Sequence, residues 1–134
     1  MSLALTLMVM KYPFQLGCKE WSANISLEMH TDYRITGQVV HPGHRKARVA
    51  LEAKLSGAPQ IRTYSLPPNV VVGRYDDEGE RRERTDPYGQ ELRWTYARNL
   101  KQLVIPEDAD WPNKAIKAFI DQCPDNTAIV LYFH

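Results

Sequence analysis

Apolar and polar side chains alternate along much of the chain, and a period of two residues predicts β-strands with one buried face. The alternation is clearest over residues 46–55, where Ala47, Val49 and Leu51 alternate with mainly polar side chains. We expect two further alternating strands over 23–29 and 33–39, and shorter strands over 3–10, 61–66, 70–75, 91–96 and 103–105. Because turn-forming segments separate most of these runs, they are expected to pair as an antiparallel sheet.

The last part of the chain predicts a helix followed by a strand. Pro112 suits the first turn of a helix and Pro124 ends it, so the helix is expected over about 112–123. Six consecutive apolar residues then predict a final strand over about 127–133 that is buried on both sides. The apolar side of the helix is expected to consist of Trp111, Ala115, Ile116, Phe119, Ile120 and Cys123, and the polar side of Asn113, Lys114, Lys117, Asp121 and Gln122.

These elements predict an α+β protein that is mainly β: a curled antiparallel sheet or small barrel-like sheet with one C-terminal amphipathic helix. A two-sheet β-sandwich is the alternative. No internal repeat or linker divides the sequence, so residues 1–134 are expected to form a single domain. Residues 76–90 contain six acidic and three basic side chains and no aliphatic one. They are therefore expected to form a long, charged and mobile hairpin loop.

Composition narrows the classes of function. Seventeen basic and sixteen acidic side chains leave a formal net charge of +1, so the domain as a whole has no strong positive field for nucleic acids or membranes. The apolar run over 3–10 is too short to span a bilayer. Cys18 and Cys123 are too few and too distant in sequence for a disulfide-stapled secreted fold. A soluble protein of the reducing cytoplasm, with no membrane partner, is expected.

No pattern in the sequence predicts catalysis or a cofactor. His41 and His44 lie three residues apart, but zinc needs three or four ligands, and no cysteine or well-placed carboxylate accompanies them. Cys123 lies on the apolar side of the predicted helix, where packing explains it. There is no Gly-rich phosphate-binding loop. The chain is therefore predicted to need no metal or other cofactor, and a non-enzymatic role is favoured.

Basic and aromatic residues gather in two places, and these are the candidate binding residues. The first group is His41, His44, Arg45, Lys46 and Arg48, and the second is Trp94 and Tyr96. The leading hypothesis is a non-catalytic binding module that contacts a protein partner through residues 41–48 and the charged loop over 76–90. Its basis is that recognition usually resides in loops carried by a rigid scaffold.

Two alternatives stay open at this point. The first is a small-ligand-binding protein or enzyme that uses the interior or mouth of the curled sheet, with Tyr33, Tyr64, Trp94 and Tyr96 as lining residues. The second is nucleic-acid binding through the basic hairpin over 44–62. A pocket of several hundred cubic ångströms with convergent polar groups would favour the small ligand. A contiguous positive groove would favour the nucleic acid.

Overall fold

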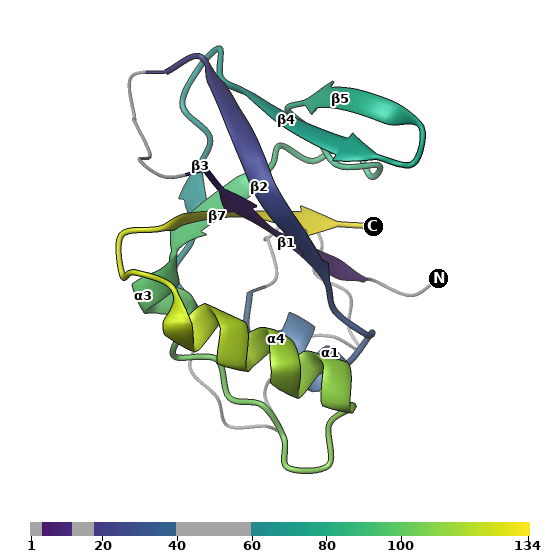
Figure 1. Cartoon of the computed structure of the whole chain (residues 1–134), viewed down its shortest axis with the longest axis vertical. Helices are drawn as coiled ribbons and strands as arrows, with labels where there is room; N and C mark the ends of the chain where they lie inside the picture. Colours follow the sequence, from purple (N-terminus) through teal and green to yellow (C-terminus); the bar gives the residue numbers. More distant parts are fainter. Residues whose placement is uncertain (1–3, 12–17, 40–59) are drawn as a thin grey trace.

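The computed structural model describes residues 4–11, 18–39 and 60–134 (Figure 1). The predicted strand over 46–55 and the first group of candidate binding residues, His41, His44, Arg45, Lys46 and Arg48, lie outside the described residues. The described strands are β1 (Leu5–Met10), β2 (Glu20–Glu28), β3 (Tyr64–Ser65), β4 (Val71–Asp76), β5 (Gly79–Glu83), β6 (Arg93–Tyr96) and β7 (Ala128–Phe133). The described helices are α1 (Tyr33–Thr36), α3 (Ala97–Leu100) and α4 (Trp111–Gln122).

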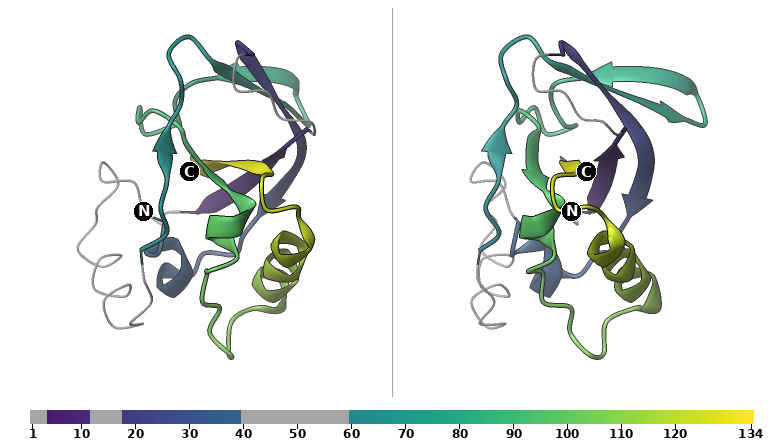
Figure 2. Two further views of the ribbon diagram at one scale, coloured as in Figure 1. Left: turned by 90° about the vertical axis from the view of Figure 1, so that its left-hand side faces the viewer. Right: turned by 60° about the vertical axis from the view of Figure 1, so that its left-hand side comes forward.

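The strands form one strongly curled sheet, a half-barrel, with the order β3-β6-β7-β1-β2-β4-β5 (Figures 1 and 2). The prediction of a mainly β, α+β protein with a curled sheet and a C-terminal helix is confirmed. Neighbouring strands pair antiparallel except β2 and β4, which pair in parallel. This departure has a simple cause: more than forty residues, 29–70, separate the two strands, and only a long connection lets two strands run in the same direction.

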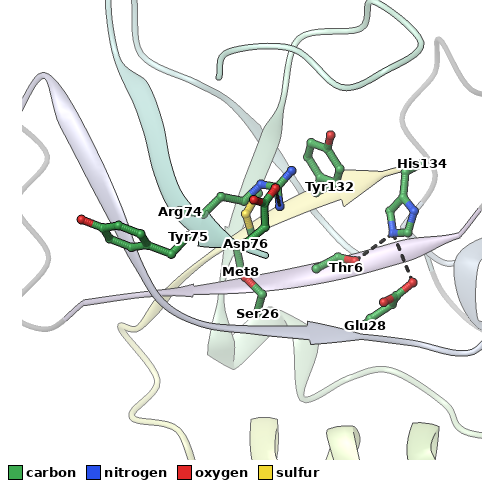
Figure 3. Close-up of a pocket in the computed structure, with 9 residues that line it drawn as sticks. All are labelled: Thr6, Met8, Ser26, Glu28, Arg74, Tyr75, Asp76, Tyr132 and His134. Atoms are coloured by element: carbon green, nitrogen blue, oxygen red, sulfur yellow. Dashed lines mark hydrogen bonds and ion pairs between the residues drawn. The ribbon is translucent and has the colours of Figure 1, made fainter. Parts of the chain in front are cut away.

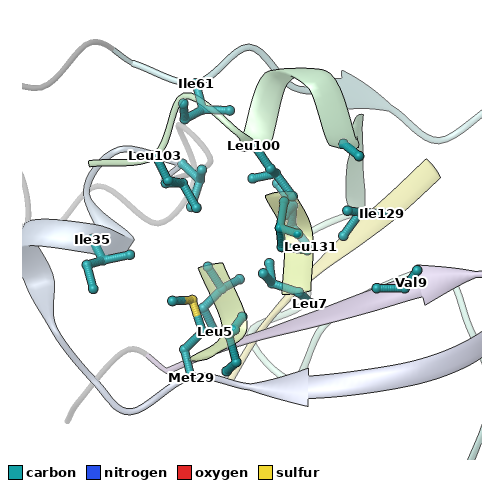
Figure 4. Close-up of a cluster of buried hydrophobic side chains, with 14 of the residues drawn as sticks. Leu5, Leu7, Val9, Met29, Ile35, Ile61, Leu100, Leu103, Ile129 and Leu131 are labelled. Carbon is teal, nitrogen blue, oxygen red and sulfur yellow. The ribbon is translucent and has the colours of Figure 1, made fainter. Parts of the chain in front are cut away.

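Side chains from the two faces of β1 and β7 enter two different hydrophobic clusters. Leu5, Leu7 and Val9 lie opposite Phe133, Leu131 and Ile129 and pack against the helices (Figure 4). The intervening residues Met8 and Val130 pack on the inner side of the curl, in the cluster that contains Trp21 and Trp94. Because both faces are covered, these central strands carry nearly continuous apolar sequences, as the prediction for residues 127–133 required.

The helix α4 lies where the sequence predicts it, but it is rotated relative to the predicted apolar side. Its buried residues are Asn113, Ile116 and Ile120, whereas Trp111 is 78% exposed and Phe119 is 40% exposed. Asn113, predicted on the polar side, is fully buried because its amide bonds both backbone groups of His30, at 2.8 and 2.9 Å. Among the described residues, no helix has the length and apolar character needed to cross a membrane.

Two strand predictions are wrong. Residues 33–36 form the short helix α1, because the Asp32 carboxylate accepts a hydrogen bond from the Arg34 amide and the Asp32 carbonyl accepts from the next two amides. Residues 103–105 form no strand, because the side-chain amide of the buried Gln38 bonds the backbone of Val104 at the centre of this segment. The amide donates to the Val104 carbonyl at 2.8 Å and accepts from the Val104 N–H at 3.0 Å.

The prediction of a long loop over 76–90 is also wrong, because β5 lies within it. β4 and β5 form a hairpin around a turn at residues 77–78, and Gly79 follows with a φ of +117°, which favours glycine. β5 lies at the edge of the sheet, and its charged side chains pair with neighbouring carboxylates and arginines. Charged residues are common on edge strands, so low hydrophobicity did not exclude a strand here.

Candidate ligand pocket at the mouth of the half-barrel

A cavity of about 400 Å³ opens between β4 and the inner face of the central strands (Figure 3). It is lined by Thr6 and Met8 of β1, Ser26 and Glu28 of β2, Arg74, Tyr75 and Asp76 of β4, Tyr132 of β7, and His134. The sheet register brings these residues together: Thr6 lies opposite both Glu28 and Tyr132. Residues opposite one another on adjacent strands point to the same face.

The cavity exists because β2 and β4 pair over only a short length. Their parallel pairing covers Glu20 to Ser22 on β2 and ends at Gly73 on β4. Beyond Gly73, β4 leaves β2 and continues into the hairpin with β5, while the rest of β2 pairs with β1. The last residues of β4 therefore lie across the mouth of the curl and close one side of the cavity.

One wall of the pocket is built around Arg74. Its guanidinium lies 4.8 Å from the centroid of the Tyr132 ring, its Nε lies 3.3 Å from Glu83 Oε2, and its Nη1 lies 3.7 Å from Asp76 Oδ2. Asp76 also accepts a hydrogen bond from Arg81, and this bond, followed by one from the Glu78 amide, holds the pKa of the Asp76 carboxyl below its ordinary range. The positive charge of Arg74 is thus neutralised by two nearby carboxylates.

Tyr132 stays a neutral phenol on this wall. Burial raises the pKa of Tyr132 above its ordinary value, and the nearby carboxylate of Glu83 raises it further. A neutral phenol both donates and accepts hydrogen bonds. The wall therefore combines a paired arginine with an aromatic ring and a hydroxyl group.

The other wall is formed by Thr6, Glu28 and His134, whose side chains offer several hydrogen-bond acceptors. His134 Nε2 lies 2.8 Å from Thr6 Oγ1 and 4.0 Å from Glu28 Oε1 (Figure 3). The Glu28 side chain is 71% exposed, and within the described part of the chain no arginine or lysine lies within 4.0 Å of its carboxylate. Among the described residues, Glu28 is therefore the lining carboxylate that has no arginine or lysine partner, and the imidazole of His134 is its nearest polar neighbour.

The geometry around His134 differs from that of an activated hydroxyl nucleophile. A hydroxyl nucleophile needs an imidazole that accepts its proton at one nitrogen while an acid orients the other nitrogen. Here Thr6 and Glu28 both approach the same atom, His134 Nε2. This arrangement fixes the imidazole between two strands, but it does not form a proton relay.

The aromatic residues predicted as binding residues lie elsewhere on the inner face. Trp94 is buried, with ring centroids 5.4 Å from Trp21, 5.1 Å from Tyr64 and 4.9 Å from Tyr96. Its indole N–H donates to the Ser65 carbonyl at 3.1 Å. Neither Trp94 nor Tyr96 lines the pocket, so packing explains Trp94. Tyr33 packs against the helix-side cluster instead.

Sequence reasoning missed the residues that do line the pocket. Ser26 and Glu28 belong to the polar side of the strand predicted over 23–29, and nothing in the sequence indicates that this side borders a cavity. One signal was present: Thr6 is a hydrogen-bonding residue inside an otherwise apolar run. A polar side chain at a buried strand position usually has a partner, and here the partner is His134.

Among residues 4–11, 18–39 and 60–134, no group of three or more histidine, cysteine or acidic side chains is arranged to hold a metal ion. Comparison of the chain with protein-family models, with curated proteins and with solved structures gives no match.

Proposed function

We propose that this protein binds a small polar molecule carrying an ammonium group in the cavity between β4 and the central strands. The observation that carries the proposal is the cavity itself, about 400 Å³ in volume, into which polar side chains from β1, β2, β4 and β7 converge. Small-ligand sites are typically concavities of this size, with a few polar groups that fix orientation. A binding role is also consistent with the absence of a proton relay at His134.

The charges of the lining residues favour a cation over an anion. Arg74 is already engaged by Asp76 and Glu83, and Asp76 is itself held by Arg81, whereas no arginine or lysine of the described residues pairs with Glu28. An ammonium group placed near Glu28 would gain a charge-assisted hydrogen bond, with the Thr6 and Ser26 hydroxyls as further acceptors. An anion would have to displace one of the carboxylates that hold Arg74.

Calorimetric titration with a panel of small primary amines tests the proposal, with alcohols and carboxylates of the same size as controls. Glu28→Gln should weaken amine binding about fivefold, the equivalent of about 1 kcal/mol for a partly exposed ion pair. Glu107→Gln makes the same chemical change at an exposed position outside the pocket and should leave the affinity unchanged.

A second pair of variants tests the location. Ser26→Trp would fill the cavity and should abolish binding, whereas Asn24→Trp places the same side chain at an exposed position of β2 that does not line the pocket. Both positions are exposed, so folding should be preserved. The proposal fails if no amine binds at millimolar concentration, or if each variant binds like its control.

Protein binding is the second candidate, and one observation offers a further contact surface besides the predicted segments over 41–48 and 76–90. Trp111 and Phe119 are 78% and 40% exposed on α4, and large exposed aromatic residues are typical of interfaces. The charged segment over 76–90 is less suited to bind a partner protein. Two of its arginines, Arg81 and Arg82, already form ion pairs within the hairpin and with Glu20. Cross-linking at a cysteine introduced at position 111 would test for a partner.

We further infer a reducing compartment such as the cytoplasm. Cys18 is exposed and Cys123 is half-buried, and no disulfide joins them. Burial raises the pKa of the Cys123 thiol, which disfavours the reactive thiolate. Thiol labelling of both cysteines in protein isolated under non-reducing conditions would test this inference.

A further inference from the structure

Two arginine–tyrosine stacks lie together at the β3–β6 edge of the sheet. The Arg98 guanidinium carbon is 3.9 Å from the Tyr96 ring centroid, and the Arg62 guanidinium carbon is 5.4 Å from the Tyr64 ring centroid. The two tyrosine rings are themselves 5.9 Å apart in an edge-to-face arrangement. Both arginines are exposed and both tyrosines are half-buried. We call these four residues the Arg–Tyr surface.

The Arg–Tyr surface is positively charged. Among the described residues, no carboxylate lies within 4.0 Å of Arg62 or Arg98. Asp125 is an acidic neighbour of Arg98, but its carboxylate pairs with Lys101 Nζ at 2.7 Å. The two arginines and Lys101 therefore outnumber Asp125 by three charges to one.

Hydrogen bonds hold the backbone of Arg62 and both the backbone and the guanidinium of Arg98 in place. The Arg62 carbonyl accepts a hydrogen bond from Thr95 Oγ1 at 2.7 Å, which ties this residue to β6. Arg98 Nη1 donates to Asn126 Oδ1 at 2.9 Å, and the Arg98 amide donates to the Asp125 carbonyl at 3.2 Å. A guanidinium that is already ordered loses less entropy when it binds a ligand.

We propose that the Arg–Tyr surface binds single-stranded nucleic acid. Each guanidinium lies within cation–π distance of a tyrosine ring and belongs to an exposed arginine, so an unpaired base can stack on the guanidinium or the ring while the guanidinium N–H groups contact the adjacent phosphate. Stacking of this kind is tolerant of sequence, because every base has a π-face. A duplex does not offer such faces, since its bases are stacked on one another. This site is separate from the ammonium pocket and does not depend on it.

Fluorescence anisotropy with a labelled oligothymidylate of about ten nucleotides tests the proposal, with affinity measured over a series of salt concentrations. Arg62→Gln and Arg98→Gln should each weaken binding about fivefold or more and lower the salt slope by about 0.7, the value for one phosphate of a single strand. Arg82→Gln is the matched control, because Arg82 is an exposed arginine of β5 that pairs with Glu20 and Glu80.

Arg98→Lys separates stacking from charge. It keeps the positive charge but loses the planar group, so we expect the salt slope to stay unchanged while affinity falls several-fold. The proposal is overturned if the wild-type chain does not bind the oligonucleotide at low salt, or if Arg82→Gln weakens binding as much as Arg98→Gln. It is also overturned if a duplex of the same length, or heparin, which has no bases, binds as tightly as the single strand.

Discussion

Asn113→Ala should destabilise the fold by about 2.5 kcal/mol. The Asn113 side chain is fully buried in the first turn of α4, where Oδ1 accepts from the His30 N–H at 2.8 Å and Nδ2 donates to the His30 carbonyl at 2.9 Å. Two net hydrogen bonds contribute about 0.5–1.5 kcal/mol each, and a backbone group left without a partner adds about 1 kcal/mol. The higher helix propensity of alanine offsets about 0.5 kcal/mol of this loss in the free energy of unfolding.

Urea denaturation followed by circular dichroism measures this change directly, provided that the slope of the transition stays constant. Asn126→Ala is the matched control, because Asn126 is exposed and bonds an exposed arginine; its loss should cost less than about 0.5 kcal/mol. Asn113→Asp keeps the acceptor for the His30 N–H but buries a carboxylate oxygen against the His30 carbonyl, so at neutral pH it should cost at least as much as Asn113→Ala. If Asn113→Ala is as stable as Asn126→Ala, the anchoring of α4 through His30 is refuted.

Three further predictions concern stability and pH. Gln38→Ala should cost about 2–4 kcal/mol in urea denaturation, because the buried Gln38 amide bonds the Arg34 carbonyl and both backbone groups of Val104; a cost below about 1 kcal/mol would contradict this network. Trp111→Ala should change the free energy of unfolding by less than about 0.5 kcal/mol, since the indole is 78% exposed; a large loss would show that the indole is buried in the native protein. A hydrogen bond from Arg34 lowers the pKa of Asp108, so the stabilisation from this pair is complete above about pH 4, the unfolded value, and is lost as pH falls through the lower folded value. Asp108→Asn should therefore flatten the acid limb of stability against pH, and an unchanged acid limb would show that the pair does not form in solution.

The elements that sequence predicted well are those whose burial is set by neighbours on both sides. β1 and β7 lie at the centre of the sheet, so their near-continuous apolar sequences identify them without knowledge of the pairing. The existence of α4 follows from its spacing and from Pro112 and Pro124. The rotation of α4 does not follow, because Trp111 is apolar yet exposed, and Asn113 is polar yet satisfied by a distant backbone segment.

The elements that sequence predicted poorly depend on contacts between distant segments. The alternation of Tyr33 and Ile35 with polar residues imitates a strand, but the cap formed by Asp32 favours one helical turn. β5 has no apolar face because it lies at an edge, where ion pairs rather than burial accompany its pairing with β4.

The pocket was the least predictable feature. Its lining comes from the point at which β4 leaves β2, and this point is fixed by register rather than by any local pattern. The sequence places basic and aromatic residues together around Trp94 and Tyr96. In the structure Trp94 is buried in the core, whereas Tyr96 belongs to the Arg–Tyr surface.

A backbone amide ¹H–¹⁵N correlation spectrum, recorded during titration with the tightest-binding amine of the panel, tests the central claim most directly. The account predicts saturable shifts at Thr6, Ser26, Glu28 and Asp76, and none at Trp111 or Phe119. Glu28→Gln should weaken the response at the same four amides without moving it elsewhere. Saturable shifts confined to α4, or no shifts at millimolar amine, would contradict the assignment of the ligand site to the mouth of the half-barrel.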